Sequence, residues 1–432
     1  MPYFTDIQDS LNELLHWADL RHEQGIDVRE TLASLRRELK LGRAKLEQSK
    51  PDAKALAREP NGLDAIRALR PAGPRKLWDA YPGAKRLKSR MAGAWLGRAA
   101  GCTLGVPVEG WPVEDMARLA KRNGQAFPPT DYWTAHPTPD RVQYEKSVVQ
   151  HYLRGSMKCV PVDDDLTYTL LGLLILEEYG PNFTTEDVGK AWMKYLPVAC
   201  TAEDVALKNL KAGVPTKKVG EKSNPFQEWI GADIRSDPWG YAAPGWPERA
   251  AELAYRDAFI SHRQNGIYGE MYFSAVIAAA FAVDSPIEAL KIGLGEIPRG
   301  CRLAKDLQWA FKVVPALKDW RAARAAVDER FKGMHVVHTN NNACLTVFGL
   351  MLGKGDFTRT VGTTVAMGLD NDCTGATAGS ILGAVIGIEG IPEHWWKPFR
   401  NRTQTYMNGQ EWFRNTEVVE RFLAVAERTW RE

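Results

Sequence analysis

Two dense groups of acidic residues constrain this chain more than any other feature of its sequence. Asp163, Asp164 and Asp165 are consecutive, and Asp370 and Asp372 follow roughly two hundred residues later. Carboxylates packed this closely repel one another unless a cation neutralises them, and hard oxygen ligands suit Mg²⁺, Mn²⁺ or Ca²⁺. A single Asp at a helix start is usually an N-cap, but three in a row exceed what capping requires. The sequence therefore predicts a metal site.

Each acidic group stands at the start of a segment with helical character. The first runs into residues 166–178, which are too long an apolar stretch for a typical strand and end before Gly180. This pattern predicts a buried helix whose first turn carries the aspartates, where the positive end of the helix dipole tolerates them. The second precedes residues 375–387, in which small residues recur every three or four positions and let another helix approach closely. We therefore expect two carboxylate-bearing helix N-termini to meet inside a helical bundle.

A glycine repeat is the third motif. Glycine occupies every fourth position from Gly93 to Gly105, so the glycines line one helix face and admit a tightly packed neighbour. The chain then turns at Pro107 and presents Glu109, a candidate acid or base. Glycine spacing alone is weak evidence, and a lone loop glutamate is more often solvated than catalytic.

Composition limits the classes of function. The chain has 432 residues, of which 44% are hydrophobic and 25% charged, and can bury a large core. A net charge of +3 is too balanced to imply nucleic acid or an anionic membrane as the main partner. The six cysteines form no Cys-x-x-Cys pair, so neither a zinc site nor a disulfide framework is indicated. Neither a signal peptide nor a membrane span is evident, and we expect a cytoplasmic location.

The first part of the chain differs from the rest. We expect residues 1–88 to form a helical N-terminal extension and residues 89–432 to form the catalytic body. Apolar residues from Val28 to Leu39 recur at helical spacing after Asp27, with Glu30 placed as in a capping box, and residues 11–18 share this periodicity. The extension could be a lid, a partner-binding module or an element that mediates homo-oligomerisation, or it could simply cover core surface.

The body is predicted to be mostly α-helical. Helical apolar patterns are clearest in residues 250–259, 271–283, 343–352 and 418–430. Strand-like alternation is scarce, and no convincing βαβ unit or internal repeat is present. The sequence therefore favours an all-α fold.

Together these motifs resemble the ADP-ribosylglycohydrolase family, which includes the dinitrogenase reductase-activating glycohydrolase and the ADP-ribosylarginine and ADP-ribosylserine hydrolases. The resemblance covers about Met91 to about Gly390 and rests on Pro-Val-Glu after the glycine repeat, the aspartates that open an apolar helix, and Gly-Leu-Asp-Asn-Asp-Cys-Thr-Gly-Ala. It implies an all-α, orthogonally packed multi-helix bundle with two Mg²⁺ ions at the base of an ADP-ribose cleft. It also implies a substrate that is ADP-ribosylated or is a small ribosyl conjugate.

The resemblance assigns roles to individual residues. Glu109 falls on the flap glutamate that contacts metal or substrate in the family, and the implied metal ligands are Asp163, Asp164, Asp165, Asp370 and Asp372. Residues 231–235, beginning at Gly231 and following Trp229, resemble the loop that cradles ribose and diphosphate. His262 is similar to the histidine of a Thr-His pair near the nucleotide, and Asn265 follows it. From the residues alone, a role for His262 in the core is as reasonable as one in substrate binding.

Three positions depart from the family pattern. Asp163 stands where Thr or Ser is usual, Leu166 replaces a Thr, and Cys373 replaces the Thr that often ligates beside the second aspartate. A thiol is a poor ligand for Mg²⁺. Either a water, Thr374 or the carboxylate of Asp163 takes the place of the missing Thr ligand, or the site favours another metal such as Mn²⁺.

The implied reaction is hydrolysis of a glycosidic bond at ribose C1′. Because the sugar becomes oxocarbenium-like as the bond lengthens, the enzyme must hold the ribose, activate a water and protonate the leaving group. Paired metal ions can bind the 2′- and 3′-hydroxyls and acidify a bound water, with Glu109 or Asp164 as the base.

The acidic motifs also resemble those of other protein classes. Residues 370–374 match the Asp-x-Asp-x-Thr of haloacid dehalogenase-type phosphatases and the first half of an EF-hand loop, but no preceding strand is predicted and Ile381 stands where an EF-hand needs Glu. The Asp-Asp-x-x-Asp of terpenoid synthases is broken at Thr167 and Tyr168. The serious alternative is an ADP-ribose-binding or scaffold protein of the same fold that performs no turnover.

Overall fold

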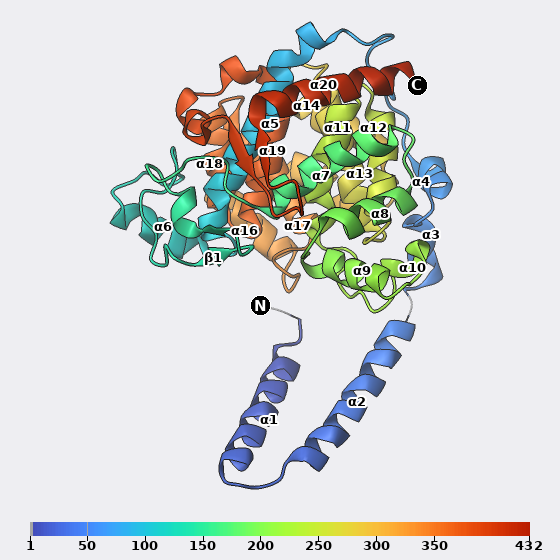
Figure 1. Cartoon of the computed structure of the whole chain (residues 1–432), viewed down its shortest axis with the longest axis vertical. Coiled ribbons are helices and arrows are strands. Elements are labelled where there is room, and N and C mark those ends of the chain that lie inside the picture. The colour runs from blue at the N-terminus through green and yellow to red at the C-terminus, as the bar shows by residue number, and fades with distance from the viewer. Residues whose placement is uncertain (1–2, 50) are drawn as a thin grey trace. The chain divides into compact units, whose positions relative to one another are not determined.

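The computed structural model describes residues 3–49 and 51–432, and it confirms the all-α fold (Figure 1). The β-structure of these residues consists of two antiparallel ribbons, β1 with β2 and β3 with β4, and two isolated bridges, Val160 with Thr403 and Trp229 with His338. The helices and strands are α1 (Thr5–Glu23), α2 (Arg29–Gln48), α3 (Ala53–Arg58), α4 (Leu63–Leu69), α5 (Ala84–Gly105), α6 (Val113–Arg122), β1 (Val142–Gln143), β2 (Ser147–Val148), α7 (Asp164–Tyr179), α8 (Thr185–Tyr195), α9 (Thr201–Lys211), α10 (Thr216–Val219), α11 (Asp237–Ala242), α12 (Pro247–Ala258), α13 (Asn265–Ala280), α14 (Pro286–Gly293), α15 (Arg302–Val313), α16 (Trp320–Arg330), α17 (Thr339–Gly353), α18 (Phe357–Ala366), α19 (Asn371–Ile386), β3 (Arg402–Gln404), β4 (Trp412–Arg414) and α20 (Asn415–Arg431).

The chain divides into two compact units. The smaller comprises residues up to Ala57 together with Glu329–His335, and the larger comprises Arg58–Asp328 and Val336–Glu432. Residues 58–88 therefore belong to the larger unit, while the functional boundary expected at residue 88 stays a prediction. Among the described residues, no helix combines the length and apolar character needed to cross a membrane.

The smaller unit contains the two amphipathic helices expected from the sequence, α1 and α2. The expected N-cap of α2 is wrong: the cap residue is Val28, whose side chain makes no cap hydrogen bond. The carboxylate of Asp27 instead accepts a bond from the backbone N–H of Arg29 (3.0 Å) and pairs with the guanidinium of that residue. Because Asp27 is held by Arg29, the capping box with Glu30 does not form.

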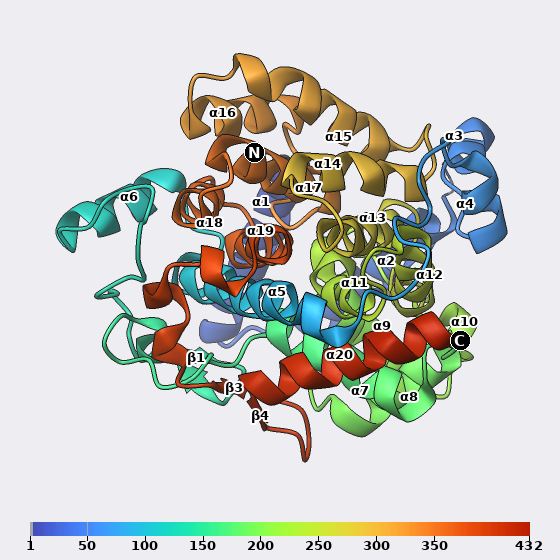
Figure 2. The same cartoon turned by 90° about the horizontal axis from the view of Figure 1, so that it is seen from above.

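Two helices, α5 and α19, pack against each other through their glycine residues and form the centre of the larger unit. Along α5 and α19 the glycines face one another: a Cβ added at Gly97 or Gly101 would collide with the backbone of Gly379 or Gly375, respectively. Only glycine allows the two backbones to approach this closely. The close helix pair predicted from the glycine repeat is thus confirmed, and Figure 2 shows α5 and α19 side by side.

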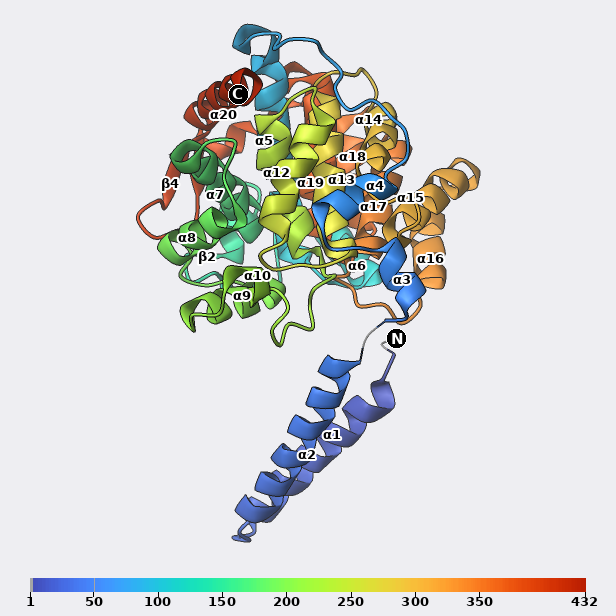
Figure 3. The same cartoon turned by 90° about the vertical axis from the view of Figure 1, so that its right-hand side faces the viewer.

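Other helices enclose this pair. α13 is buried along its whole length and packs between α12, α11 and α19, as Figures 2 and 3 show. α17 and α18 cover another side of α19, and α20 lies against α5. The four helical segments expected in the body correspond to α12, α13, α17 and α20, with ends that differ by a few residues. The core therefore surrounds the helix that begins with the second acidic group.

Candidate metal and active site

The first acidic group lies at the start of α7, as its sequence predicts. Asp163 is the N-cap, and its side chain accepts the backbone N–H of Asp165 at 3.0 Å. Asp164 and Asp165 occupy the first turn, and the apolar helix ends at Gly180, whose φ of +76° favours glycine. Capping accounts for one aspartate of the three, so the other two carboxylates are available for another task.

The second acidic group lies at the start of α19. Asp370 occupies the N-cap position but makes no side-chain cap hydrogen bond, and Asp372 lies in the first turn. The preceding turn is tight, because Leu369 has a φ of +64° and Gly368 a φ of +71°. One buried oxygen of Asp372 has no hydrogen-bond partner. Such an unsatisfied carboxylate is costly in a protein interior unless another ligand binds it.

The glycine repeat sets the position of α19 relative to Glu109. A Cβ added at Gly105, the last residue of α5, would collide with the backbone of Asp372. The 3-10 helix η1 (Val106–Val108) follows at once and delivers Glu109 beside the start of α19. One oxygen each from Glu109, Asp370 and Asp372 lies within 4.8 Å of the others. These three carboxylates offer oxygens at a spacing that a divalent cation could share.

The two acidic groups converge on one cavity. A pocket of about 130 Å³ has carboxylates from both of them in its lining: Glu109, Asp164, Asp165, Asp370 and Asp372. Asp163 lies behind this lining, where Asp163, Asp165 and the thiol of Cys102 approach within 4.8 Å of one another. The structure therefore brings all of the acidic residues selected from the sequence into one region, although their role as ligands stays a prediction.

Burial raises the pKa of every carboxyl group in the cluster. Burial is the larger cause for Asp163, Asp165 and Asp372, whose pKa values lie well above the usual range, and neighbouring carboxylates add to it. Burial raises the pKa of Asp370 to about 6. At the exposed mouth of the pocket, desolvation and then the charges of Asp370 and Asp164 raise the pKa of Glu109. The site as built is therefore strongly electronegative and favours either protons or cations.

A buried arginine partly balances this charge and was not anticipated from the sequence. Arg98 projects from α5, contacts Asp165 at 2.9 Å and Asp237 at 2.6 Å, and donates to the hydroxyl of Thr169 at 2.8 Å. All of these groups are buried. Arg98 therefore fixes the orientation of Asp165.

The thiols near the site are poor candidates for ligation. Burial and the neighbouring aspartates raise the pKa values of both Cys102 and Cys373 well above the ordinary value. Mg²⁺ also prefers oxygen ligands to sulfur. Thr374 follows Cys373 and has a buried hydroxyl without a hydrogen-bond partner.

The pocket also contains residues that sequence reasoning missed. Tyr144, in the turn between β1 and β2, bonds Asp164 and stacks on Tyr406 at a centroid distance of 5.0 Å. Glu203, in the first turn of α9, lines the pocket and pairs with Arg235, which also binds Asp257 and Glu270. No sequence pattern links these residues to the aspartates, because each comes from a separate segment.

The predicted substrate-binding residues fall into two groups. Trp229 and Gly231 line the pocket, and Gly231 is held so close to the carboxylate of Glu203 that a Cβ would collide with it. His262 is fully buried, lies 2.8 Å from the hydroxyl of Ser261, and has a pKa well below the usual value because of burial and the charge of Arg235. It is not part of the pocket lining.

Asn265 is also absent from the pocket lining. Its amide donates to Glu59 (3.1 Å) and Glu228 (3.0 Å), and its oxygen accepts the backbone N–H of Leu303. Its side chain is thus engaged in joining α13 to neighbouring segments. A role in substrate binding for Asn265 or His262 stays a prediction.

Comparison with known proteins agrees with this geometry. The ADP-ribosylglycohydrolase family model matches residues 83–431. The chain belongs to the ADP-ribosylglycohydrolase family. Family membership makes it a hydrolase of glycosidic bonds and a member of a metal-dependent family, consistent with the acidic cluster.

Solved structures show the same fold. One of them, described as an "ADP-ribosylglycohydrolase-related protein complex", shares 20% sequence identity with a TM-score of 0.50, and the match covers 80% of this chain and 99% of the other. At 20% sequence identity this similarity supports the fold alone. No curated protein matched significantly by sequence.

Proposed function

We propose that this chain hydrolyses the glycosidic bond at ribose C1′ of an ADP-ribosyl or related N-ribosyl conjugate with the help of two Mg²⁺ ions. The catalytic body comprises residues 89–432, and the expected location is the cytoplasm. The observation that carries this proposal is the convergence of carboxylates from η1, α7 and α19 on a single pocket.

The carboxylates suit two hard divalent ions better than one. Glu109, Asp370 and Asp372 form one compact oxygen set, while Asp163, Asp164 and Asp165 lie at the start of a different helix, α7. Their combined charge exceeds that of a single divalent ion, even after Arg98 has offset part of it. When bound, such ions would orient the ribose hydroxyls and acidify a water molecule. Mn²⁺ has similar oxygen preferences and is a reasonable substitute.

Glu109 is the best placed residue to accept a proton. It lies at the mouth of the pocket, where substrate and water can reach it, and it follows a short rigid 3-10 helix. A general base works best when its pKa approaches the operating pH, and the pKa of Glu109 is raised in that direction. Asp164 is the second candidate, with its carboxylate oriented by Tyr144.

The shape of the pocket limits how the substrate binds. A cavity of about 130 Å³ accommodates ions, water and part of a ribose, whereas pockets for complete ligands usually span roughly 300–1,000 Å³. The adenylate part of an ADP-ribosyl group must therefore lie outside this cavity, beyond the lining that contains Trp229 and Gly231.

A panel of substrates tests the proposal and its alternative. ADP-ribosyl-arginine, ADP-ribosyl-serine and small N-ribosyl nucleosides would be incubated with the protein and Mg²⁺, and products measured by mass spectrometry. We expect release of the ribosyl group from at least one conjugate, no release in excess EDTA, and nearly none from Asp372→Ala. Saturable ADP-ribose binding without product from any conjugate would support the binding or scaffold role instead.

A further inference from the structure

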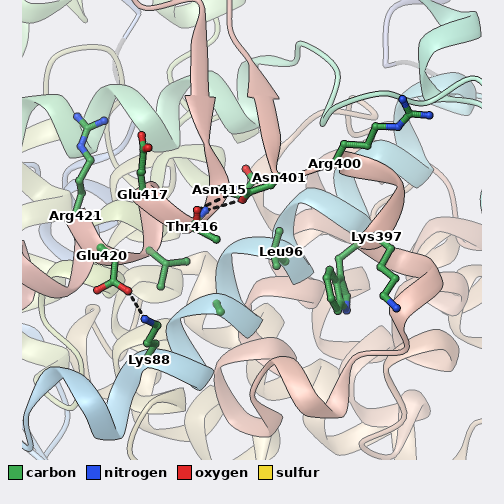
Figure 4. Close-up of a pocket in the computed structure, with 13 residues that line it drawn as sticks. Lys88, Leu96, Lys397, Arg400, Asn401, Asn415, Thr416, Glu417, Glu420 and Arg421 are labelled. Atoms are coloured by element: carbon green, nitrogen blue, oxygen red, sulfur yellow. Dashed lines mark hydrogen bonds and ion pairs between the residues drawn. The ribbon is translucent and has the colours of Figure 1, made fainter.

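A second pocket on the larger unit has the features of a ligand site and shares no residue with the acidic site. It has a volume of about 740 Å³, within the usual range for small-molecule pockets, and lies between the start of α5, the turn after Lys397 and the start of α20 (Figure 4). Its walls are largely apolar, and Ala92, Leu96, Val419 and the indole of Trp396 contribute to them.

Two hydrogen-bond donors at this pocket have no partner. Asn415 is only 3% exposed, and its oxygen accepts bonds from the indole N–H of Trp95 (3.1 Å) and the hydroxyl of Thr403 (2.5 Å). These two donors fix the orientation of the amide, so its Nδ2 is the donating atom left unpaired. The indole Nε1 of Trp396 is likewise buried and unpaired. Each such donor costs about 1–3 kcal/mol unless an acceptor reaches it.

The lining of the pocket contains four cationic side chains, Lys88, Lys397, Arg400 and Arg421, and two carboxylates, Glu417 and Glu420. Lys88 pairs with Glu420, Arg421 with Glu177 at 2.6 Å, and Lys397 with Glu393 at 2.5 Å. Arg400 also lines the pocket, but no carboxylate within residues 3–49 and 51–432 lies at ion-pair distance from it. In Figure 4 Arg400 and Lys397 lie on the side of the pocket opposite the Lys88–Glu420 pair. One uncompensated guanidinium therefore faces solvent beside an apolar cavity.

We propose that this pocket binds a small organic carboxylate with a flat, apolar body. The body would occupy the space beside Trp396, Leu96 and Val419, and the carboxylate would take Arg400 as its counter-ion. The unpaired donors of Asn415 and Trp396 lie in side chains that line the same pocket and favour an anion over a cation there. A cationic or neutral analogue lacks the carboxylate that would pair with Arg400 and suit the unpaired donors.

Calorimetric titration of the full chain with 1-naphthoate tests the assignment. A ligand of this size is expected to bind with a Kd of roughly 1 mM or tighter, and 1-naphthylmethylammonium should give no binding. Arg400→Gln should weaken binding by about tenfold, because it removes a charge-assisted contact. Ala92→Phe fills the cavity and should abolish binding. Arg86→Gln, on the same helix but outside the lining, is the matched control and should leave it unchanged.

Three results would overturn the assignment. These are no naphthoate binding at about ten times the expected Kd, equal affinity for the ammonium analogue, or full binding by Ala92→Phe. Circular dichroism of Ala92→Phe checks that it is folded. If it is not, the smaller substitution Ala92→Leu should still weaken binding, and unchanged binding by that variant would also refute the site.

An independent observation concerns the smaller unit. Neither α1 nor α2 contains a buried residue, and the two helices diverge from the turn that joins them (Figure 1). Eleven of the eighteen exposed large hydrophobic residues described lie within residues 3–46: Tyr3, Phe4, Ile7, Leu11, Leu15, Trp17, Leu20, Ile26, Leu39, Leu41 and Leu46. Helices of this length gain most of their stability from packing, so these faces need a partner.

The spacing of apolar residues and the net charges of α1 and α2 indicate which kind of partner these helices bind. Ile7, Leu11, Leu14 and Ala18 on α1 follow alternating spacings of four and three, and so do the apolar residues from Leu32 to Leu39 on α2. α1 has five carboxylates and one arginine, a net charge of −4, whereas α2 has six cations and three carboxylates, a net charge of +3. α1 of one copy thus complements α2 of another, as a two-fold symmetric interface requires.

We infer that the α1–α2 hairpin pairs with a second copy of itself to form a four-helix bundle. Helices about 30 Å long, two per copy, offer a face of roughly 600 Å² on each side. That area is at the low end for stable complexes, so the dimer should dissociate in the micromolar range.

Sedimentation analysis of the full chain over roughly 1–100 µM tests this pairing. We expect the mass to rise toward twice 48.2 kDa with concentration. Leu11→Glu should remain monomeric throughout, while His16→Glu, the same change on the outer face of α1, should dimerise like the parent. Added salt should weaken the dimer. A monomeric parent at the highest concentration, or a dimer that Leu11→Glu leaves intact, would refute the inference.

Discussion

Replacing Asp370 by asparagine should make the metal-free protein more stable and the metal-loaded protein less so. Asp370 is 8% exposed, and burial raises its pKa from 3.8 to about 6. A carboxyl group whose pKa is raised on folding destabilises the native state once it ionises. The difference corresponds to about 3 kcal/mol. Asparagine is nearly isosteric and carries no charge, so it removes this cost.

The sign of the pH dependence follows from the same two pKa values. Below about pH 3.8 the group is protonated in both states and contributes no difference. As the pH rises from about 4 to about 6, the folded protein keeps its proton while the unfolded chain loses one, and stability falls. Above about pH 6 the full difference of about 3 kcal/mol persists. The advantage of Asp370→Asn in EDTA should therefore be present at about pH 8 and shrink toward about pH 4.

Bound Mg²⁺ should make the parent protein more stable than Asp370→Asn. An ion that binds only the folded state stabilises it by about 4.1 kcal/mol at a thousandfold excess over its Kd, which exceeds the cost of about 3 kcal/mol from the Asp370 carboxylate. Parent protein should gain this at about pH 8, and Asp370→Asn should gain little because it has lost an anionic ligand.

Urea unfolding followed by far-ultraviolet circular dichroism, in EDTA and in Mg²⁺, measures both effects. Asp140→Asn, an exposed position, is the control and should behave like the parent. If Asp370→Asn is less stable than the parent in EDTA at about pH 8, the reasoning about electrostatic cost is wrong.

Three further predictions concern residues in and around the acidic site. Gly101→Ala inserts a Cβ against the backbone of Gly375 and should lower the free energy of unfolding by about 1–3 kcal/mol or more, measured by urea denaturation; parental stability would contradict the packing. Arg98→Gln leaves buried carboxylates unpaired and should cost about 3–5 kcal/mol in the same assay. Glu109→Gln should reduce turnover by about 10²–10⁴-fold while far-ultraviolet circular dichroism stays parental; full activity would exclude Glu109 as the base.

Local patterns were enough to predict the central helices. Uniform apolar composition after Asp165 marks a buried helix whatever surrounds it, and glycine at every fourth residue of α5 has few explanations other than a close helix neighbour. The neighbour itself, α19, shows the matching small residues. The fold class and the two acidic helix starts could therefore be read from sequence spacing.

The rest of the site depends on tertiary placement. Arg98 sits within the glycine repeat, and nothing in its local sequence indicates that it binds Asp165 and Asp237. Tyr144 and Glu203 reach the pocket from a short ribbon and from the first turn of α9. The cap of α2 was mispredicted because the side chain of Arg29 competes for Asp27. Such side-chain competition is decided by distances that sequence spacing does not specify.

Anomalous diffraction from crystals grown with Mn²⁺ shows whether the two acidic groups share one metal centre. We expect two anomalous peaks in the pocket, within about 2.0–2.4 Å of carboxylate oxygens from both acidic groups, so that Asp163–Asp165 and Asp370–Asp372 contribute to one centre. A pocket without peaks, or ions bound to only one of the two groups, would contradict it.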